Sequence, residues 1–450
     1  MTAGNEQSFT TSATSSTSSS SPGLVRAVGR WDLVALVING IVGAGIFGLP
    51  AKVYALIGPW SIVAIIACAV LIGIVVLCFA EVSSRFTETG GPYLYTAEAF
   101  GPFTAFVVGW LLWLARIAGI CAIAGILAEY LSFLVPSVGS GVPRALMLSS
   151  VIVAFTALHV SGVKRTVRFG NLITIAKLVP LFLFVIIGLP NVEVRAFDFS
   201  MMPERSAFSS AVLLLAFAFV GWETALVAAG ELRDPRRDTP FALLAGLAGV
   251  AFLYVGIQMV CITSLPELAK SSRPLADAAV TLIGPIGGTA IVIGASVSIL
   301  GTLNGGMLTI SRIPFAMAEA GQIPRVFASL HPVFRTPVPS ILLSTLVVLA
   351  LTLTSTHVYV LTISTIARLI VFAVTCAALP VLRKRERTLP AKFTLVGGVT
   401  IPVAAFALIA WLLASTSGRE TRDVLVATGV GALIYIVLKR QRYASAVENR

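Results

Sequence analysis

The chain has 450 residues and a formal net charge of +12, with 57% hydrophobic and 12% charged residues. Soluble domains carry about 25% charged residues, so this composition and a mean hydropathy of +0.95 exclude an ordinary soluble domain. Stretches such as residues 59–80 carry no charge, and a membrane-spanning helix needs about 20 such residues. The sequence therefore predicts an all-α polytopic membrane protein with about twelve transmembrane helices, at residues 32–56, 59–82, 100–133, 144–163, 168–190, 207–230, 240–265, 284–311, 338–355, 357–379, 394–415 and 421–438.

The N-terminal segment, residues 1–30, differs in composition from the rest. Its first 22 residues are rich in Ser and Thr and almost free of large apolar side chains, which predicts a disordered tail. The first apolar span is too long for a signal peptide, and no small-residue cleavage site follows it. We expect a second short tail at residues 441–450.

Residues that could build a cofactor or metal centre are scarce. His159, His331 and His357 do not lie at metal-ligand spacing from one another or from a cysteine. No phosphate-binding GxxxxGK[ST] motif occurs, and the five cysteines all fall within predicted spans, which argues against a disulfide framework. We therefore expect no cofactor, no metal and no catalytic residue.

The basic residues are distributed unevenly between the two sides of the membrane. With a cytoplasmic N-terminus, 21 Lys and Arg residues lie in inner segments, 8 lie in outer segments, and three (Arg116, Lys177 and Arg368) lie within spans. This bias follows the positive-inside rule. It predicts two cytoplasmic termini in an inner or plasma membrane, and it explains the positive charge without a nucleic-acid partner.

Two apolar spans contain residues that weaken a helix. The first contains "NGIVGAGIFGLP" at residues 39–50, and glycine costs a helix interior about 1 kcal/mol relative to alanine. The sixth contains Gly221, Trp222 and Glu223 within "LLLAFAFVGWETALVAAGEL". These spans are five apart, so two five-helix units would enter the membrane from opposite sides. Paired interrupted helices of this kind point to an inverted-repeat transporter.

An unwound turn at Gly43, Ala44 and Gly45 would expose hydrogen-bonding groups inside the membrane. The N–H groups that open the outer half of the first span would bind an anion, helped by the helix dipole. Freed carbonyls on the first and sixth spans would hold an ammonium group. Together these groups suit an α-amino acid. Small residues in membrane helices also serve close helix packing, but the pairing with the sixth span favours the binding site.

Several motifs resemble those of the amino acid–polyamine–organocation permeases. They are "VGAGIFGLP" in the first span, "FAEVSSRFTETGGPYLYTAEAFG" at 79–101, "GW" at 109–110, "FAFVGWETALVAAGELRDPRRDTP" at 217–240 and "GTLNGGMLTISRIPFAMAEAGQIPRVFASLHPVFRTPVPS" at 301–340. The resemblance covers about residues 30 to 440. It implies the leucine-transporter fold, with inverted five-helix repeats at 31–190 and 207–379 and two further helices within 380–440. It also implies proton-coupled uptake or exchange of amino acids or related amines.

The resemblance also suggests roles for individual residues. The family's carboxylate-binding turn falls on Gly43, Ala44 and Gly45, and Ala218 and Gly221 belong to the facing part of the substrate site. Phe217 takes the place of a tryptophan that closes the pocket of an arginine/agmatine antiporter, so an aromatic lid remains without an indole N–H.

Two ionisable groups within spans are candidates for proton coupling. Lys177 lies nine residues beyond Arg168, about 13 Å into the membrane at 1.5 Å per residue, where an ionised amine is costly. It matches a family lysine that replaces a bound cation; the alternative is a lysine that extends to the cytoplasmic surface. Glu223 is either a proton sensor or a structural acid bonded to backbone freed by the break.

Other polar residues within spans have less specific interpretations. Arg116 and Arg368 are expected to form structural ion pairs or to line the cavity, and pairing with Glu223 is one arrangement. Ser296, Ser298 and Asn304 would supply polar groups to the cavity or hydrogen bonds between helices.

The sequence thus predicts a secondary active amino acid transporter with alternating access, whose partners are the substrate, protons and the lipid bilayer. One acid and several aromatic residues in the pocket segments favour neutral L-amino acids. The alternatives are a cationic amino acid or polyamine antiporter and a non-transporting membrane sensor. A channel would show a filter built from repeated subunits, and a membrane enzyme would need a nucleophile–base or metal constellation; neither pattern is visible.

Overall fold

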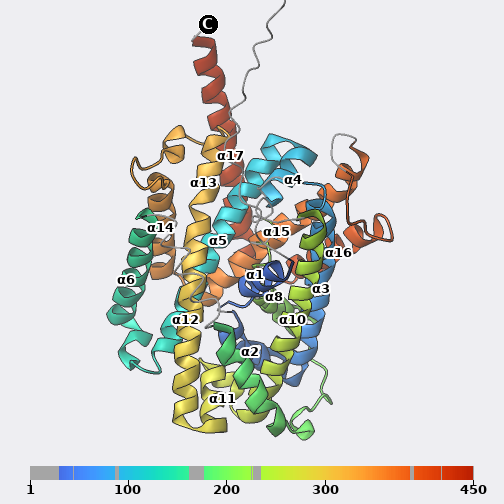
Figure 1. The fold of residues 1–450 in the computed structure, drawn as a ribbon, viewed down its shortest axis with the longest axis vertical. Coiled ribbons are helices and arrows are strands. Elements are labelled where there is room, and N and C mark those ends of the chain that lie inside the picture. Colours follow the sequence, from blue (N-terminus) through green and yellow to red (C-terminus); the bar gives the residue numbers. More distant parts are fainter. Residues whose placement is uncertain are drawn as a thin grey trace, which may run out of the picture.

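The computed structural model describes residues 30–43, 45–86, 91–161, 177–223, 226, 235–385, 390–416 and 418–448, and within these ranges all regular structure is helical (Figure 1). The helices are α1 (Arg30–Ile41), α2 (Gly45–Ile57), α3 (Ser61–Ser83), α4 (Gly91–Phe100), α5 (Pro102–Leu131), α6 (Gly141–Val160), an apolar helix at Lys177–Asn191, α8 (Arg205–Ala218), α10 (Pro235–Ser264), α11 (Pro274–Ile283), α12 (Pro285–Ile310), α13 (Arg312–Glu319), α14 (Val338–Thr354), α15 (His357–Lys384), α16 (Thr400–Ala414) and α17 (Gly418–Glu448).

The lengths of these helices suit a polytopic membrane protein. Seven apolar helical segments are long enough to cross a membrane, and several apolar helices of 10–17 residues accompany them in the described part of the chain. Each of the twelve predicted spans carries a helix, although part of the span at 168–190 lies outside the described residues. The short helices α4, α11 and α13 lie between spans and were not expected.

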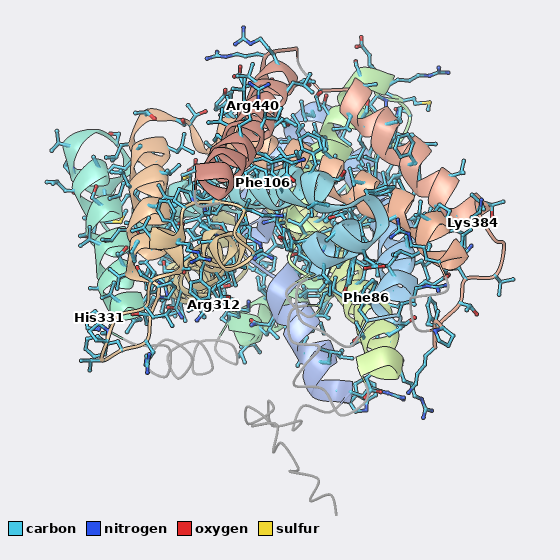
Figure 2. All side chains as sticks on the ribbon, turned by 90° about the horizontal axis from the view of Figure 1, so that it is seen from above. Phe86, Phe106, Arg312, His331, Lys384 and Arg440 are labelled. Carbon is cyan, nitrogen blue, oxygen red and sulfur yellow. The ribbon has the colours of Figure 1, made fainter. Side chains whose placement is uncertain are left out.

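The helices differ strongly in burial, and this places the core. The apolar stretch of α5 is 83% buried, whereas those of α6 and α17 are 22% and 11% buried. α5 packs against α15, α12 and α14, and Figure 2 shows Phe106 of α5 among packed helices while Lys384 lies at the edge. Exposed apolar side chains on outer helices, such as Leu146 and Leu433, are those expected of surfaces in contact with lipid.

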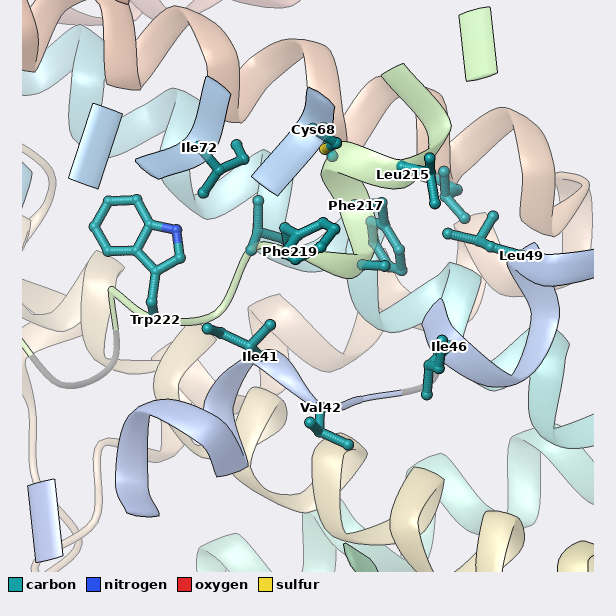
Figure 3. Packing of buried hydrophobic residues seen from close by; sticks show 14 of the residues in the cluster. Ile41, Val42, Ile46, Leu49, Cys68, Ile72, Leu215, Phe217, Phe219 and Trp222 are labelled. Atoms are coloured by element: carbon teal, nitrogen blue, oxygen red, sulfur yellow. The ribbon is translucent and has the colours of Figure 1, made fainter. Parts of the chain in front are cut away.

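Both helices with weak helix-formers are interrupted. A backbone hydrogen bond from Val42 N to Ile38 O at 2.8 Å follows the end of α1; α1 ends at Ile41 and α2 begins at Gly45. α8 ends at Ala218, and residues 219–223 are not helical. Figure 3 shows the two interruptions close together, with Ile41 and Val42 at the end of α1 and Phe217 and Phe219 at the end of α8.

The buried carboxylate of Glu81 joins three parts of the protein at the C-terminal end of α3. We call Glu81 with its partners Arg85, Arg383 and Leu395 the Glu81 clamp. Glu81 Oε1 accepts from Arg383 Nε at 2.7 Å and from Arg85 Nη2 at 3.1 Å. Its Oε2 accepts from Arg383 Nη2 at 2.6 Å and from Leu395 N at 2.8 Å. The Glu81 clamp therefore joins α3 to the end of α15 and to the segment that leads into α16.

We predict that Glu81→Ala strongly destabilises the protein. The substitution leaves the Arg383 and Arg85 guanidinium groups partly buried without their carboxylate, and breaking a buried ion pair costs about 3 kcal/mol. The thermal unfolding midpoint in detergent should fall clearly. Glu267→Ala is the matched control, because its pair with Lys270 is largely exposed and should leave the midpoint unchanged. Equal midpoints for the two variants would contradict this role of Glu81.

Candidate functional site

Lys177 binds the broken end of α1. Its side chain is 3% exposed, and its Nζ donates to Asn39 O at 2.5 Å and to Val42 O at 2.8 Å. The amine is therefore buried within the protein, where two main-chain carbonyls accept its hydrogen bonds. A buried ammonium needs such partners.

Tyr254, on α10, binds the ends of both interrupted helices. Its hydroxyl oxygen lies 3.2 Å from Ile41 O and 3.0 Å from Ala218 O, so its single O–H proton is shared between these two carbonyls. Sequence reasoning missed this residue. A tyrosine hydroxyl within the largely apolar stretch at 240–265 was the available signal, because a buried tyrosine hydroxyl usually has a hydrogen-bond partner.

These two side chains take the acceptors that would close the first helix. A continuous α-helix would bond Gly43 N to Asn39 O, Gly45 N to Ile41 O and Ile46 N to Val42 O. Lys177 and Tyr254 hold all three carbonyls instead. The amides of the turn and of the start of α2 are thereby left to other acceptors, as at any helix N-terminus.

Glu223 stabilises the second interruption. Its Oε2 accepts from Gly221 N at 2.7 Å, an amide that would bond to Phe217 O in a continuous helix. Its Oε1 pairs with Arg368 of α15. These contacts agree with a structural acid bonded to freed backbone, one of the two interpretations that the sequence left open; the other, a proton sensor, stays a prediction.

Gly221 allows the two interruptions to approach. Its φ is +114°, a region that L side chains rarely adopt. A Cβ at this position would lie 2.1 Å from Gly40 O of α1. Glycine is therefore required both by the backbone conformation and by the close contact between this segment and α1.

The remaining predicted site residues lie around the start of α2. A Cβ on Gly45 would lie 2.9 Å from Ala218 Cα and 3.4 Å from Phe217 Cδ1, whereas one on Gly43 would first meet Thr302 of α12 at 3.4 Å. The space beside Gly45 is thus already filled by the end of α8, while Gly43 is less crowded. Ala44 lies outside the described residues.

Polar groups of α5 and α12 complete the surroundings. Arg116 Nη1 donates to Thr309 Oγ1 at 3.1 Å rather than to a carboxylate. Ser296 Oγ and Ser298 Oγ are buried without a hydrogen-bond partner in the described part of the chain. Asn304 bonds to His159 Nε2 of α6 at 3.1 Å, so it forms a hydrogen bond between helices.

Comparison with known proteins identifies relatives along the whole chain. The family described as amino acid permease matches residues 28–438. A serine/threonine exchanger, SteT, of Bacillus subtilis is 30% identical over 436 residues, which cover 93% of this chain and 98% of the relative. A methylthioribose transporter and the branched-chain amino acid permease BcaP of the same organism are each 26% identical, over 95% and 93% of this chain and 96% and 94% of the respective relatives.

We predict that Gly221→Ala destabilises the protein far more than Gly43→Ala. The added Cβ at Gly221 meets a backbone oxygen in a strained conformation, at a cost of at least about 2 kcal/mol, whereas that at Gly43 meets a methyl group at ordinary distance. Gly58→Ala is the control for strain alone, because Gly58 has φ +56° and open space around it. Thermal unfolding in detergent should rank Gly221→Ala lowest. A midpoint equal to that of Gly58→Ala would show that the contact with α1 is unimportant.

Proposed function

Because the chain belongs to the amino acid permease family, we propose that it is a secondary active transporter of neutral L-amino acids, which works by proton-coupled uptake or by exchange. As a permease it is an amino acid transporter of the membrane and not an enzyme. The observation that carries the proposal is the pair of interrupted helices, α1–α2 and α8, whose ends lie against each other.

The proposed substrate lies between these ends. Its carboxylate would bind the amides of Gly43, Ala44 and Gly45; the helical acceptors of Gly43 and Gly45, which are Asn39 O and Ile41 O, are held by Lys177 and Tyr254. Its amino group would bind main-chain carbonyls of α1 and of the segment Ala218–Gly221. Phe217, beside Gly45, is the proposed aromatic lid. Ser296 and Ser298 would supply further polar groups.

Two of the three relatives described above have names that specify neutral amino acids, and these two support a neutral substrate. The names of these two specify serine and threonine or branched-chain amino acids, and that of the third specifies methylthioribose. A cationic amino acid or polyamine is the alternative substrate class within the family. A non-transporting sensor is the alternative from another class.

For the membrane arrangement we propose two inverted five-helix units, at 31–190 and 207–379, followed by two further helices within 380–440. The excess of basic residues in the inner segments supports cytoplasmic termini. The breaks in the first and sixth spans would then lie near the middle of the bilayer, where irregular backbone is tolerated only when it lines an enclosed cavity. Alternating access would proceed around that site.

The proposal predicts saturable, stereospecific uptake of neutral L-amino acids into proteoliposomes. The experiment measures uptake of a radiolabelled panel of neutral, cationic and acidic amino acids with and without a pH gradient, and compares L and D forms. Protein-free liposomes and liposomes preloaded with unlabelled amino acid separate leakage, uptake and exchange. Binding without movement across the membrane would support a sensor instead.

Lys177 is the proposed coupling residue. Its ammonium holds two carbonyls of the α1 break, and a proton on this amine would therefore stabilise the open turn. We predict that Lys177→Ala abolishes accumulation driven by a pH gradient and leaves part of the exchange at symmetric pH. A coupled proton also lets the membrane potential drive uptake, by about 2.3 kcal/mol per charge per 100 mV, which is roughly 50-fold in substrate concentration. The variant should lose this drive as well, so the fall in accumulation should be large.

Lys270→Ala is the control for this experiment, because Lys270 forms an exposed pair with Glu267 and should retain full accumulation. Added sodium should not drive uptake by the unaltered protein. A Lys177→Ala variant that still concentrates substrate on a pH gradient would place coupling elsewhere, with Glu223 as the next candidate.

A further inference from the structure

One carboxylate beside the interrupted helices interacts with two arginines, one by a direct ion pair and one at longer range. Arg368 pairs with Glu223, and Arg116 lies within electrostatic range of both. The three side chains come from α15, the α8 break and α5, and they are at least nine-tenths buried. We call these three residues the arginine–glutamate cluster. Both arginines are protonated, as arginine is in proteins. Glu223 is the negative partner of Arg368 and accepts a hydrogen bond from Gly221 N. The cluster therefore has two positive charges and one negative charge, an excess of one positive charge.

The cluster adjoins the proposed substrate site through Gly119 of α5. A Cβ on Gly119 would lie 3.7 Å from Arg368 Nη2 and 3.7 Å from Phe217 Cε2. A Cβ on Gly45 would lie 3.4 Å from Cδ1 of the same Phe217 ring. Gly119 therefore neighbours both the Arg368 guanidinium and one edge of the Phe217 ring, and the opposite edge of that ring faces the start of α2.

The cluster also retains hydrogen-bonding capacity. The Nε atoms of Arg116 and Arg368 are buried without a partner in the described residues. A charge held in such an apolar interior acts on its neighbours much more strongly than it would in water. A second positive charge brought to the Phe217 side of the site would be repelled by the excess positive charge of the cluster, whereas a hydroxyl or apolar side chain would not.

We propose that the excess positive charge of the arginine–glutamate cluster makes the transporter reject amino acids with a cationic side chain. This inference rests on the proposed function and deepens it, since it assigns the choice between neutral and cationic substrates to three named residues. Rejection by like charge is a recognised route to specificity, in which an unfavourable contact acts against the wrong ligand.

Competition with the uptake of a labelled neutral amino acid tests the inference. L-Homoserine and L-2,4-diaminobutyrate have the same number of heavy atoms and differ in the charge of the terminal group, and L-norleucine and L-lysine form a longer pair. The unaltered protein should be inhibited at least tenfold more weakly by the cationic member of each pair. Equal inhibition would overturn the inference while uptake of the neutral label still supported the proposed function. Absence of any neutral uptake would refute the proposed function itself.

Two variants separate charge from shape. Arg368→Gln removes the excess charge, and inhibition by diaminobutyrate relative to homoserine should rise at least tenfold. The double variant Arg368→Gln with Glu223→Gln has the original net charge and should again reject diaminobutyrate. Identical behaviour of the single and double variants would overturn the inference, because both alter the shape of the same pair.

A third variant covers failure of Arg368→Gln to fold. Arg116→Gln makes the same change in charge and leaves the Arg368–Glu223 pair in place, and it should raise inhibition by diaminobutyrate in the same way. Size-exclusion profiles in detergent establish which variants are folded. A folded Arg116→Gln protein with unchanged discrimination would contradict the proposed role of the charge.

Discussion

The architecture depends on how main-chain carbonyls are satisfied where the first spanning helix stops. Inside a bilayer an unpaired backbone group costs several kcal/mol, so a break is stable only if other groups replace the lost helical bonds. Here Lys177 and Tyr254, from the helix at Lys177–Asn191 and from α10, bond to Asn39 O, Ile41 O and Val42 O. The break in α1 is therefore a tertiary feature, held by side chains from two other helices.

Helix α15 connects the two interrupted helices to the Glu81 clamp, because it contributes an arginine to each. Arg368 reaches Glu223 at the second interruption, and Arg383 reaches Glu81 at the end of α3. The two arginines are separated by about 22 Å along the helix at 1.5 Å per residue. Any tilt of α15 would strain both ion pairs at once, so the Glu81 clamp and the arginine–glutamate cluster constrain the same helix at two depths.

The sequence was most informative about features that depend on local composition. Helices occur in all twelve apolar stretches because each is apolar enough to be helical in a membrane. The breaks occur where the sequence contains Gly43, Gly45 and Gly221. Tyr254 and the Glu81 clamp were not predicted, and the partner of Glu223 was left open. Apart from the local Arg85–Glu81 pair, these contacts join residues that are 36 to 314 positions apart. A lone tyrosine or glutamate in an apolar stretch indicates that a polar partner exists without identifying it.

The same carbonyls link the Lys177 proton to the shape of the proposed site. A charged donor forms a hydrogen bond about twice as strong as a neutral one, so a neutral Lys177 amine would hold Asn39 O and Val42 O more weakly. In a continuous helix Gly43 N and Ile46 N would donate to those carbonyls. These two amides would form their helical hydrogen bonds again when the Lys177 amine dissociates from the carbonyls. The turn would then close toward a continuous helix and withdraw the amides proposed to bind the carboxylate. Proton release and substrate release would thus be two consequences of one competition for the carbonyls at the end of α1.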